Sequence, residues 1–184
     1  MRIVNRFGSF RSSTAIVSAV CILGIVLILF IPLTPQLSII HNGVTVLCLD
    51  IPNGESFILR YTHSVNRSAV YDTIERADGK LIIRSSLFQA FGAGIPIADD
   101  IVNGKSIGTS LTKTERGLLL DGIDTVYPQI NLMTGTYSDH RIITDDKEFI
   151  LKDIVGEKQL IKIKITRVSL FYLINREMKN IRQI

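Results

Sequence analysis

The residue types of a nucleophilic catalytic site lie within one short segment, residues 60–75. His63 and Asp72 can act as a general base and the carboxylate that orients it, and Ser64 can act as a nucleophile. Such a trio supports hydrolase chemistry only if its side chains share one face of the element that carries them. The function of the segment therefore depends on how it folds.

A β-hairpin turning around Asn66 and Arg67 is the element expected to position these side chains. Side chains alternate between the two faces of a strand, so His63 and Asp72 come to one face, diagonally and within hydrogen-bond reach. Ser64 follows His63 directly and points to the opposite face, away from that base. We therefore favour a buried polar pair that fixes the strand register, with a catalytic dyad as the alternative. The expected register pairs Val65 with Ser68, His63 with Val70, Tyr61 with Asp72 and Leu59 with Ile74.

A second motif, FQAFGAGIP at residues 88–96, contains Gly92, Gly94 and Pro96. Two closely spaced glycines let the backbone bend sharply and present bare N–H groups, which can bind an anion or a ligand carboxylate. The motif has neither the lysine nor the helix of a phosphate-binding loop. A tight corner after a strand is the favoured interpretation, and residues 92–108 are expected to form a long loop.

The remaining candidate ligands do not form a metal-binding pattern. His41, His63 and His140 are widely separated in the sequence. The acidic pairs at 99–100 and 145–146 lack the spaced oxygen ligands of a calcium loop and are expected to be surface turns. We expect neither a metal nor another cofactor, and no enzymatic activity.

An uncharged apolar run at residues 14–33 follows a basic N-terminal segment, residues 1–13. A helix over this run would match the roughly 30 Å hydrocarbon core of a bilayer. Arg2, Arg6 and Arg11 lie before the run, which orients the N-terminus toward the cytoplasm. A cleaved signal peptide is the alternative, but its apolar core is usually about 7–15 residues and ends in small residues. We expect a retained transmembrane anchor.

The anchor accounts for most of the net charge of +4. Without its three flanking arginines the chain holds 18 of its 21 basic residues against 17 acidic ones, so the remainder is nearly neutral. That balance gives no reason to expect nucleic acid as a partner. Cys21 in the anchor and Cys48 beyond it would lie in different environments and cannot pair.

The chain beyond a connector at residues 34–43 is expected to form an all-β domain at 44–170, followed by a tail at 171–184. Short segments rich in Val, Ile, Phe and Tyr alternate with Asx-Gly pairs, which predicts a small antiparallel sandwich or barrel-like domain. In the last strand, isoleucines alternate with Lys162 and Lys164, so one face is buried. From Leu170 on, a frayed terminus is the favoured interpretation, and a short helix that contacts lipid headgroups is the alternative. The predicted strands are 44–49, 56–62, 69–76, 81–88, 117–120, 141–144, 149–153 and 160–169, and the predicted Asx-Gly turns are at 42–43, 53–54, 78–79, 103–104 and 121–122.

Several of these motifs together resemble a bacterial family known as domain of unknown function 1850. They are YTHSV at 61–65, Asp72, the pair at 78–79 and FGAGIP at 91–96. The family shares a His-Ser-Val motif, a later acidic residue and a Gly-Ala-Gly-aliphatic-Pro loop, and the likeness is most specific over residues 57–96. The matched residues, to which the resemblance assigns no role, are His63, Ser64, Asp72, Gly92, Gly94 and Pro96.

The resemblance implies an association with TAXI-type TRAP transporters, which take up small organic anions across an inner membrane. The expected function is a periplasmic or extracellular accessory or interaction module, anchored in the inner membrane and partnered by a TRAP permease or solute-binding protein. One alternative is a β module that binds a small organic anion. A hydrolase that uses His63 and Asp72 is a further alternative.

Overall fold

A computed structural model describes residues 8–65, 67–89, 101–102, 105–106, 109–145 and 147–181, with backbone alone at 8–14, 101–102, 105–106 and 176–181. The chain divides into two compact units, which are treated separately. One unit is Gln36–Thr166 and contains the β-sheets. The other combines the described part of Met1–Pro35 with that of Arg167–Ile184.

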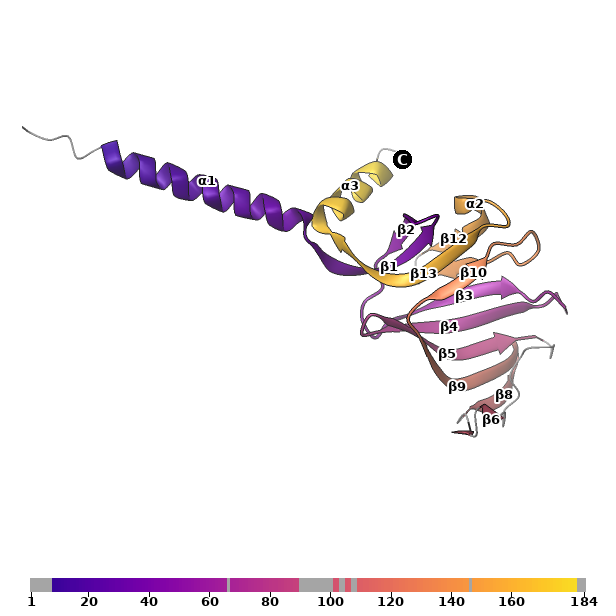
Figure 1. The fold of residues 1–184 in the computed structure, drawn as a ribbon. Helices are drawn as coiled ribbons and strands as arrows, with labels where there is room; N and C mark the ends of the chain where they lie inside the picture. Colours follow the sequence, from indigo (N-terminus) through magenta and orange to yellow (C-terminus); the bar gives the residue numbers. More distant parts are fainter. Residues whose placement is uncertain are drawn as a thin grey trace, which may run out of the picture. The chain divides into compact units, whose positions relative to one another are not determined.

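The strands form two larger sheets and one two-stranded sheet (Figure 1). Every strand pair with a defined register is antiparallel, which confirms the predicted all-β class. The four-stranded sheet has the order β10 (Ile130–Met133), β13 (Leu160–Ser169), β1 (Pro32–His41), β2 (Val44–Leu49). The seven-stranded sheet has the order β12 (Glu148–Ile150), β11 (Arg141–Ile143), β3 (Ser56–Thr62), β4 (Ala69–Ala77), β5 (Lys80–Phe88), β9 (Gly117–Tyr127), β8 (Ser110–Thr114). The two-stranded sheet pairs β6 (Ile101–Val102) with β7 (Lys105–Ser106), and the helices are α1 (Gly8–Phe30), α2 (Leu151–Val155) and α3 (Leu170–Ile181).

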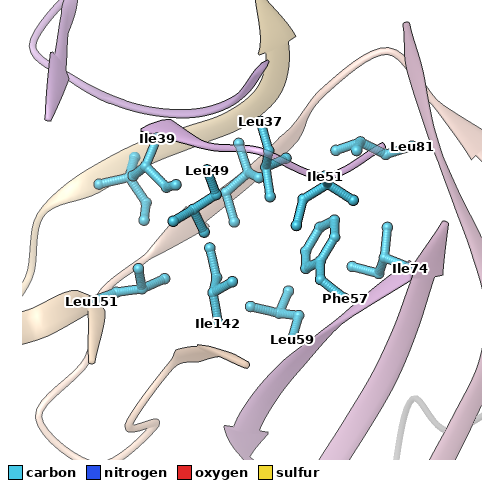
Figure 2. Packing of buried hydrophobic residues seen from close by; sticks show 12 residues of the cluster. Leu37, Ile39, Leu49, Ile51, Phe57, Leu59, Ile74, Leu81, Ile142 and Leu151 are labelled. Atoms are coloured by element: carbon cyan, nitrogen blue, oxygen red, sulfur yellow. The ribbon is translucent and has the colours of Figure 1, made fainter. Parts of the chain in front are cut away.

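The main core lies between the two larger sheets. Figure 2 shows side chains of β1 and β2, among them Leu37 and Ile39, directed toward Leu59 and Ile142 of the larger sheet. Burial of each such aliphatic side chain contributes roughly 1.5–3 kcal/mol. The domain is therefore a sandwich, as the spacing of its strands predicts. The buried cluster comprises Leu37, Ile39, Leu49, Ile51, Phe57, Leu59, Ile74, Leu81, Ile142, Leu151, Ile161 and Ile163.

Strands with a clear period-two pattern occur where the sequence predicts them. The bounds of β2, β3 and β13 agree with the prediction residue for residue. In β13, Ile161 and Ile163 are fully buried and Lys162 is exposed. The Asx-Gly pairs at 42–43 and 78–79 have positive φ at both residues and connect hairpins, as predicted.

Two predicted features of the sheets are wrong. The Asp121-Gly122 pair is not a turn, because it lies inside β9, where the pairing with β5 is irregular and Gly122 has a φ of 77°. It therefore belongs to a β-bulge, for which glycine is equally suited. The strand predicted at 149–153 ends at Ile150, because Leu151 begins α2 and packs into the core.

Strand β1 occupies most of the segment that we expected to be a connector, residues 34–43. Pro32 and Pro35 suggest irregular backbone in the sequence. Proline is nevertheless tolerated near the start of a strand, where a missing N–H donor costs little. After the prolines, Gln36 to Ile39 are all buried. The connector is thus part of the domain core.

Helix α1 ends at Phe30, three residues before the expected end of the apolar run. Its large apolar side chains, such as Ile16, Leu23 and Ile25, are exposed on all sides of the helix. Over the residues that the structure describes, no helix is both long enough and apolar enough to cross a membrane. In the same unit, residues 170–181 form helix α3, so the favoured interpretation of a frayed terminus is wrong and the alternative of a short helix is confirmed.

Candidate functional site

The hairpin that carries the His-Ser-Val motif has a different register from the predicted one. Thr62 pairs with Ala69, and Tyr61 with Val70, so the predicted register is wrong by two residues. The connection is a six-residue loop, 63–68, rather than a tight turn. The backbone N–H of His63 donates to Ser68 O at 2.9 Å, and that of Arg67 donates to His63 O at 3.0 Å. The longer loop moves His63 off the end of β3.

Tyr61 takes the diagonal position beside Asp72 that we expected for His63. Its hydroxyl forms a hydrogen bond with the Asp72 carboxylate. Ser86 on β5, the cross-strand partner of Asp72, donates from Oγ to Asp72 Oδ1 at 2.7 Å. Asp72 is thus part of a polar group, as predicted, but the group is half-buried and its other members are a tyrosine and a serine. The sequence allows this arrangement, because Tyr61 and His63 are two residues apart and their side chains would point to the same face of a strand.

The environment of this group favours neutral forms. Burial raises the pKa of Asp72, while the hydrogen bonds from Ser86 and Tyr61 act in the opposite direction. Burial, and then the nearby charge of Asp72, raise the pKa of Tyr61 above its usual range. Tyr61 therefore keeps its proton and serves as a hydrogen-bond donor to the carboxylate. A group of this kind anchors strands rather than activating a nucleophile.

His140 extends the polar group on the other side of Tyr61. The two rings stack with centroids 5.8 Å apart and planes inclined by 29°. His140 Nδ1 lies 3.1 Å from Ser138 Oγ, and burial lowers the pKa of His140, partly offset by the charge of Asp139. The sequence indicates no partner for His140, because only the fold brings residue 140 beside β3.

An ion cluster fixes the loop that contains Ser138. Asp139 accepts hydrogen bonds from Arg60 Nη1 at 2.8 Å and from Arg141 Nη2 at 2.5 Å, and Arg141 Nη1 reaches Glu148 at 2.9 Å. The hydrogen bonds from Arg141, with a smaller part from Arg60, hold the pKa of Asp139 below its usual range. The cluster ties residues 134–140 to β3, β11 and β12.

Two loops at this end of the larger sheet are joined and carry exposed apolar side chains. The backbone N–H of Thr62, the last residue of β3 before the 63–68 loop, donates to Ser138 O at 2.7 Å, which holds the start of that loop beside the 134–140 loop. Val65 is 68% exposed and Tyr137 is 86% exposed. Ser64 is exposed as well, and the Val65 N–H lies 3.3 Å from His63 Nδ1. We call residues 63–68 and 134–140 together the loop pair.

The motif residues therefore serve different parts of the site. Asp72 lies in the half-buried polar group, whereas His63 and Ser64 belong to the loop pair. Gly92, Gly94 and Pro96 lie outside the described residues, as do the acidic pair at 99–100 and the turn at 103–104. The anion-binding interpretation of the glycine motif stays a prediction. Among the residues that are described, no three His, Cys, Asp or Glu side chains gather as metal ligands do.

Comparison with known families identifies one match. A family model described as a domain of unknown function (DUF1850) matches residues 57–151, half of the chain. The match begins in β3, ends at the first residue of α2, and includes both loops of the loop pair and the half-buried polar group. No curated protein and no solved structure matches the chain.

Proposed function

We propose, on the premise that this chain belongs to the DUF1850 family, that it is a membrane-anchored accessory module that binds a TRAP-type transporter of the TAXI class. Its β unit would bind the permease or the solute-binding protein on the outer side of the inner membrane. The resemblance of the sequence supplies the class of partner. The geometry supports binding as the mode of action.

The loop pair is the observation that carries the proposal. Val65 and Tyr137 are an exposed apolar and an exposed aromatic side chain on two hydrogen-bonded loops, and protein interfaces use such residues as anchors. Hydrogen bonds hold both loops. The Arg60–Asp139 pair fixes the loop of Tyr137, and backbone hydrogen bonds from His63 to Ser68 and from Arg67 to His63 close the loop of Val65. Preorganised loops lose little conformational entropy on binding.

Hydrolysis has less support from the same geometry. Asp72 accepts hydrogen bonds from Tyr61 and Ser86, so its carboxylate is engaged in joining strands. Ser64 lies on the exposed surface of a loop. A triad requires the serine, its base and the orienting carboxylate to form one hydrogen-bonded series. The register of β3 and β4 instead puts His63 and Ser64 in the loop and Asp72 within the sheet.

Membrane anchoring rests on the apolar run of the sequence and on the exposure of α1. The uncharged run covers residues 14–33, whereas the helical residues with described side chains cover only 15–30. The first turn of the helix contains no acidic residue, and its described side chains are apolar on all sides, which is typical of a helix surrounded by lipid. In such an anchor, the arginines before the run would orient the N-terminus toward the cytoplasm and the β unit toward the outer side.

Co-purification tests the proposed partner. Tagged full-length protein is extracted in mild detergent from cells that express a TAXI permease and solute-binding protein, and its partners are identified by mass spectrometry. We expect either transporter component to be enriched with the native chain. The V65S/Y137S double variant should lose most of that enrichment, because it removes both exposed side chains without touching the core.

The matched control is Val44→Ser. Val44 on β2 is 65% exposed, so its truncation costs as little in stability as that of Val65. It should leave the enrichment unchanged. If neither component is enriched with the native chain, the proposal fails. Equal loss with Val44→Ser would mean that the loop pair has no special part in binding.

A further inference from the structure

We propose that α3 lies along the membrane surface and binds anionic lipid, as a second membrane contact beside α1. This inference rests on the proposed anchoring of α1. It assigns a lipid-binding role to the C-terminal end of the chain, outside the residues that the family model matches.

The sequence of α3 has the apolar spacing of an interfacial helix. Its apolar residues recur at intervals that fall on one face, and its basic residues occupy other positions. Phe171 and Ile174, in the first two turns, are 45% and 50% exposed. The apolar positions on that face are Leu170, Phe171, Ile174, Met178 and Ile181.

The position of α3 within its unit places it beside the end of the apolar helix. Phe171 stacks on Phe30 with ring centroids 4.7 Å apart and planes inclined by 29°. Phe30 is the last residue of α1, and so lies where the chain would leave the hydrocarbon (Figure 1). Ser169 Oγ accepts a hydrogen bond from the Tyr172 N–H at 3.2 Å, which fixes the start of α3 at this point.

Charge favours a lipid surface as the occupant. Arg176 and Lys179 lie in α3 and Arg182 follows it, against one acidic residue, Glu177. Basic residues in an amphipathic helix next to a membrane anchor are attracted to anionic headgroups, and the attraction weakens with salt. The apolar face would enter the boundary between headgroups and chains, while the basic positions meet lipid phosphates.

Tryptophan fluorescence can test this in the full-length protein, because the chain contains no tryptophan. Single variants Ile174→Trp and Leu23→Trp are reconstituted into phosphatidylcholine–phosphatidylglycerol vesicles that contain lipids brominated either near the headgroup or deep in the chain. Unbrominated vesicles give the reference intensity. We expect Ile174→Trp to be quenched most by the shallow bromines and Leu23→Trp most by the deep ones.

The two variants separate the two possible failures. Deep quenching of Leu23→Trp with no quenching of Ile174→Trp would overturn the inference about α3 and leave the anchoring of α1 intact. Absence of quenching at Leu23→Trp would overturn the anchoring and the inference together.

Lipid charge is tested with R176Q/K179Q in the Ile174→Trp background. The double variant should lose most of the extra quenching that phosphatidylglycerol produces over pure phosphatidylcholine, with Leu23→Trp quenching unchanged by the same substitutions. Equal quenching of Ile174→Trp in the two kinds of vesicle would overturn the anionic-lipid assignment. Protection of the tryptophan in Ile174→Trp only when a permease is present would also overturn this assignment, because α3 would then contact a protein and not lipid.

Discussion

Asp72 is a half-buried carboxyl that accepts hydrogen bonds from two neutral donors. Tyr61 and Ser86 each contribute one hydrogen bond, and each bond to a charged group is worth about 1.5–3 kcal/mol. These bonds do not fully offset the loss of solvation, because the pKa of Asp72 remains raised. The residue therefore makes the stability of the β unit depend on pH.

The direction of that dependence follows from linkage. A raised pKa in the folded state means that the fold binds a proton more readily than the unfolded chain does. The free energy of unfolding therefore falls as the pH rises from 3.8, the ordinary carboxyl value, through the raised value. We expect D72N to flatten this part of the pH profile, by about 1.4 kcal/mol for each unit by which the pKa is raised.

Urea unfolding between pH 4 and 8 measures the effect, with D121N as the control because Asp121 is an exposed carboxyl on β9. His140 has the opposite slope, since its lowered pKa means that stability is lost as the pH falls below 6.5. All variants are therefore compared in an H140Q background. An unchanged profile in D72N would contradict the assignment of a raised pKa to Asp72.

Sequence reasoning placed Asp72 in a buried polar group but assigned it the wrong partner. Strand parity is a local property, so the shared face of Tyr61, His63 and Asp72 follows from the sequence. The register also depends on the length of the loop, and the six-residue loop holds Arg67 at a left-handed φ of 54°. His140 could not be placed at all, because its contact with Tyr61 depends on pairing between β3 and β11.

At the scale of elements, β1 changes the boundaries of the domain. It lies between β13 and β2 in the four-stranded sheet and supplies Leu37 and Ile39, both fully buried. Loss of a buried aliphatic side chain costs about 2–5 kcal/mol, and a domain is stable by about 5–15 kcal/mol in total. A β unit without β1 should not remain folded.

Two fragments test this boundary. We expect residues 36–166 to unfold cooperatively with heat, and residues 44–166, which begin at the boundary suggested by the sequence, to lack a cooperative transition. Circular dichroism and native-state proteolysis are suitable measurements, with reducing agent present to keep the Cys48 thiol reduced. Equal melting temperatures for the two fragments would show that β1 is dispensable.

The elements that could be predicted are those whose signals are local. Alternating side chains defined β2, β3 and β13, and Asx-Gly pairs defined two hairpin turns. The 121–122 pair carried the same local signal but lies in a bulge, because β9 continues beyond it to pair with β5. Strand β1 was missed because prolines mask a segment whose burial depends on strands distant in the sequence.

At the scale of the whole molecule, different parts of the chain have different proposed roles. Helix α1 is proposed to anchor the protein, α3 to contact the lipid surface and the loop pair to bind a transporter component. The nearly neutral charge of the rest of the chain suits a partner recognised by apolar anchors rather than by charge. All three tasks require the β unit to lie outside the inner membrane while the chain stays membrane-bound.

Cysteine labelling in intact cells tests that requirement most directly. Full-length protein with Cys21→Ala and Tyr137→Cys is treated with a membrane-impermeant maleimide before lysis, and labelling is measured in the membrane pellet. The chain with Cys21→Ala alone is the control, because its remaining thiol, Cys48, is only 3% exposed. The account predicts labelling of Tyr137→Cys in intact cells, with the labelled protein in the pellet after carbonate washing. Labelling only after lysis, or recovery of the protein in the soluble fraction, would contradict it.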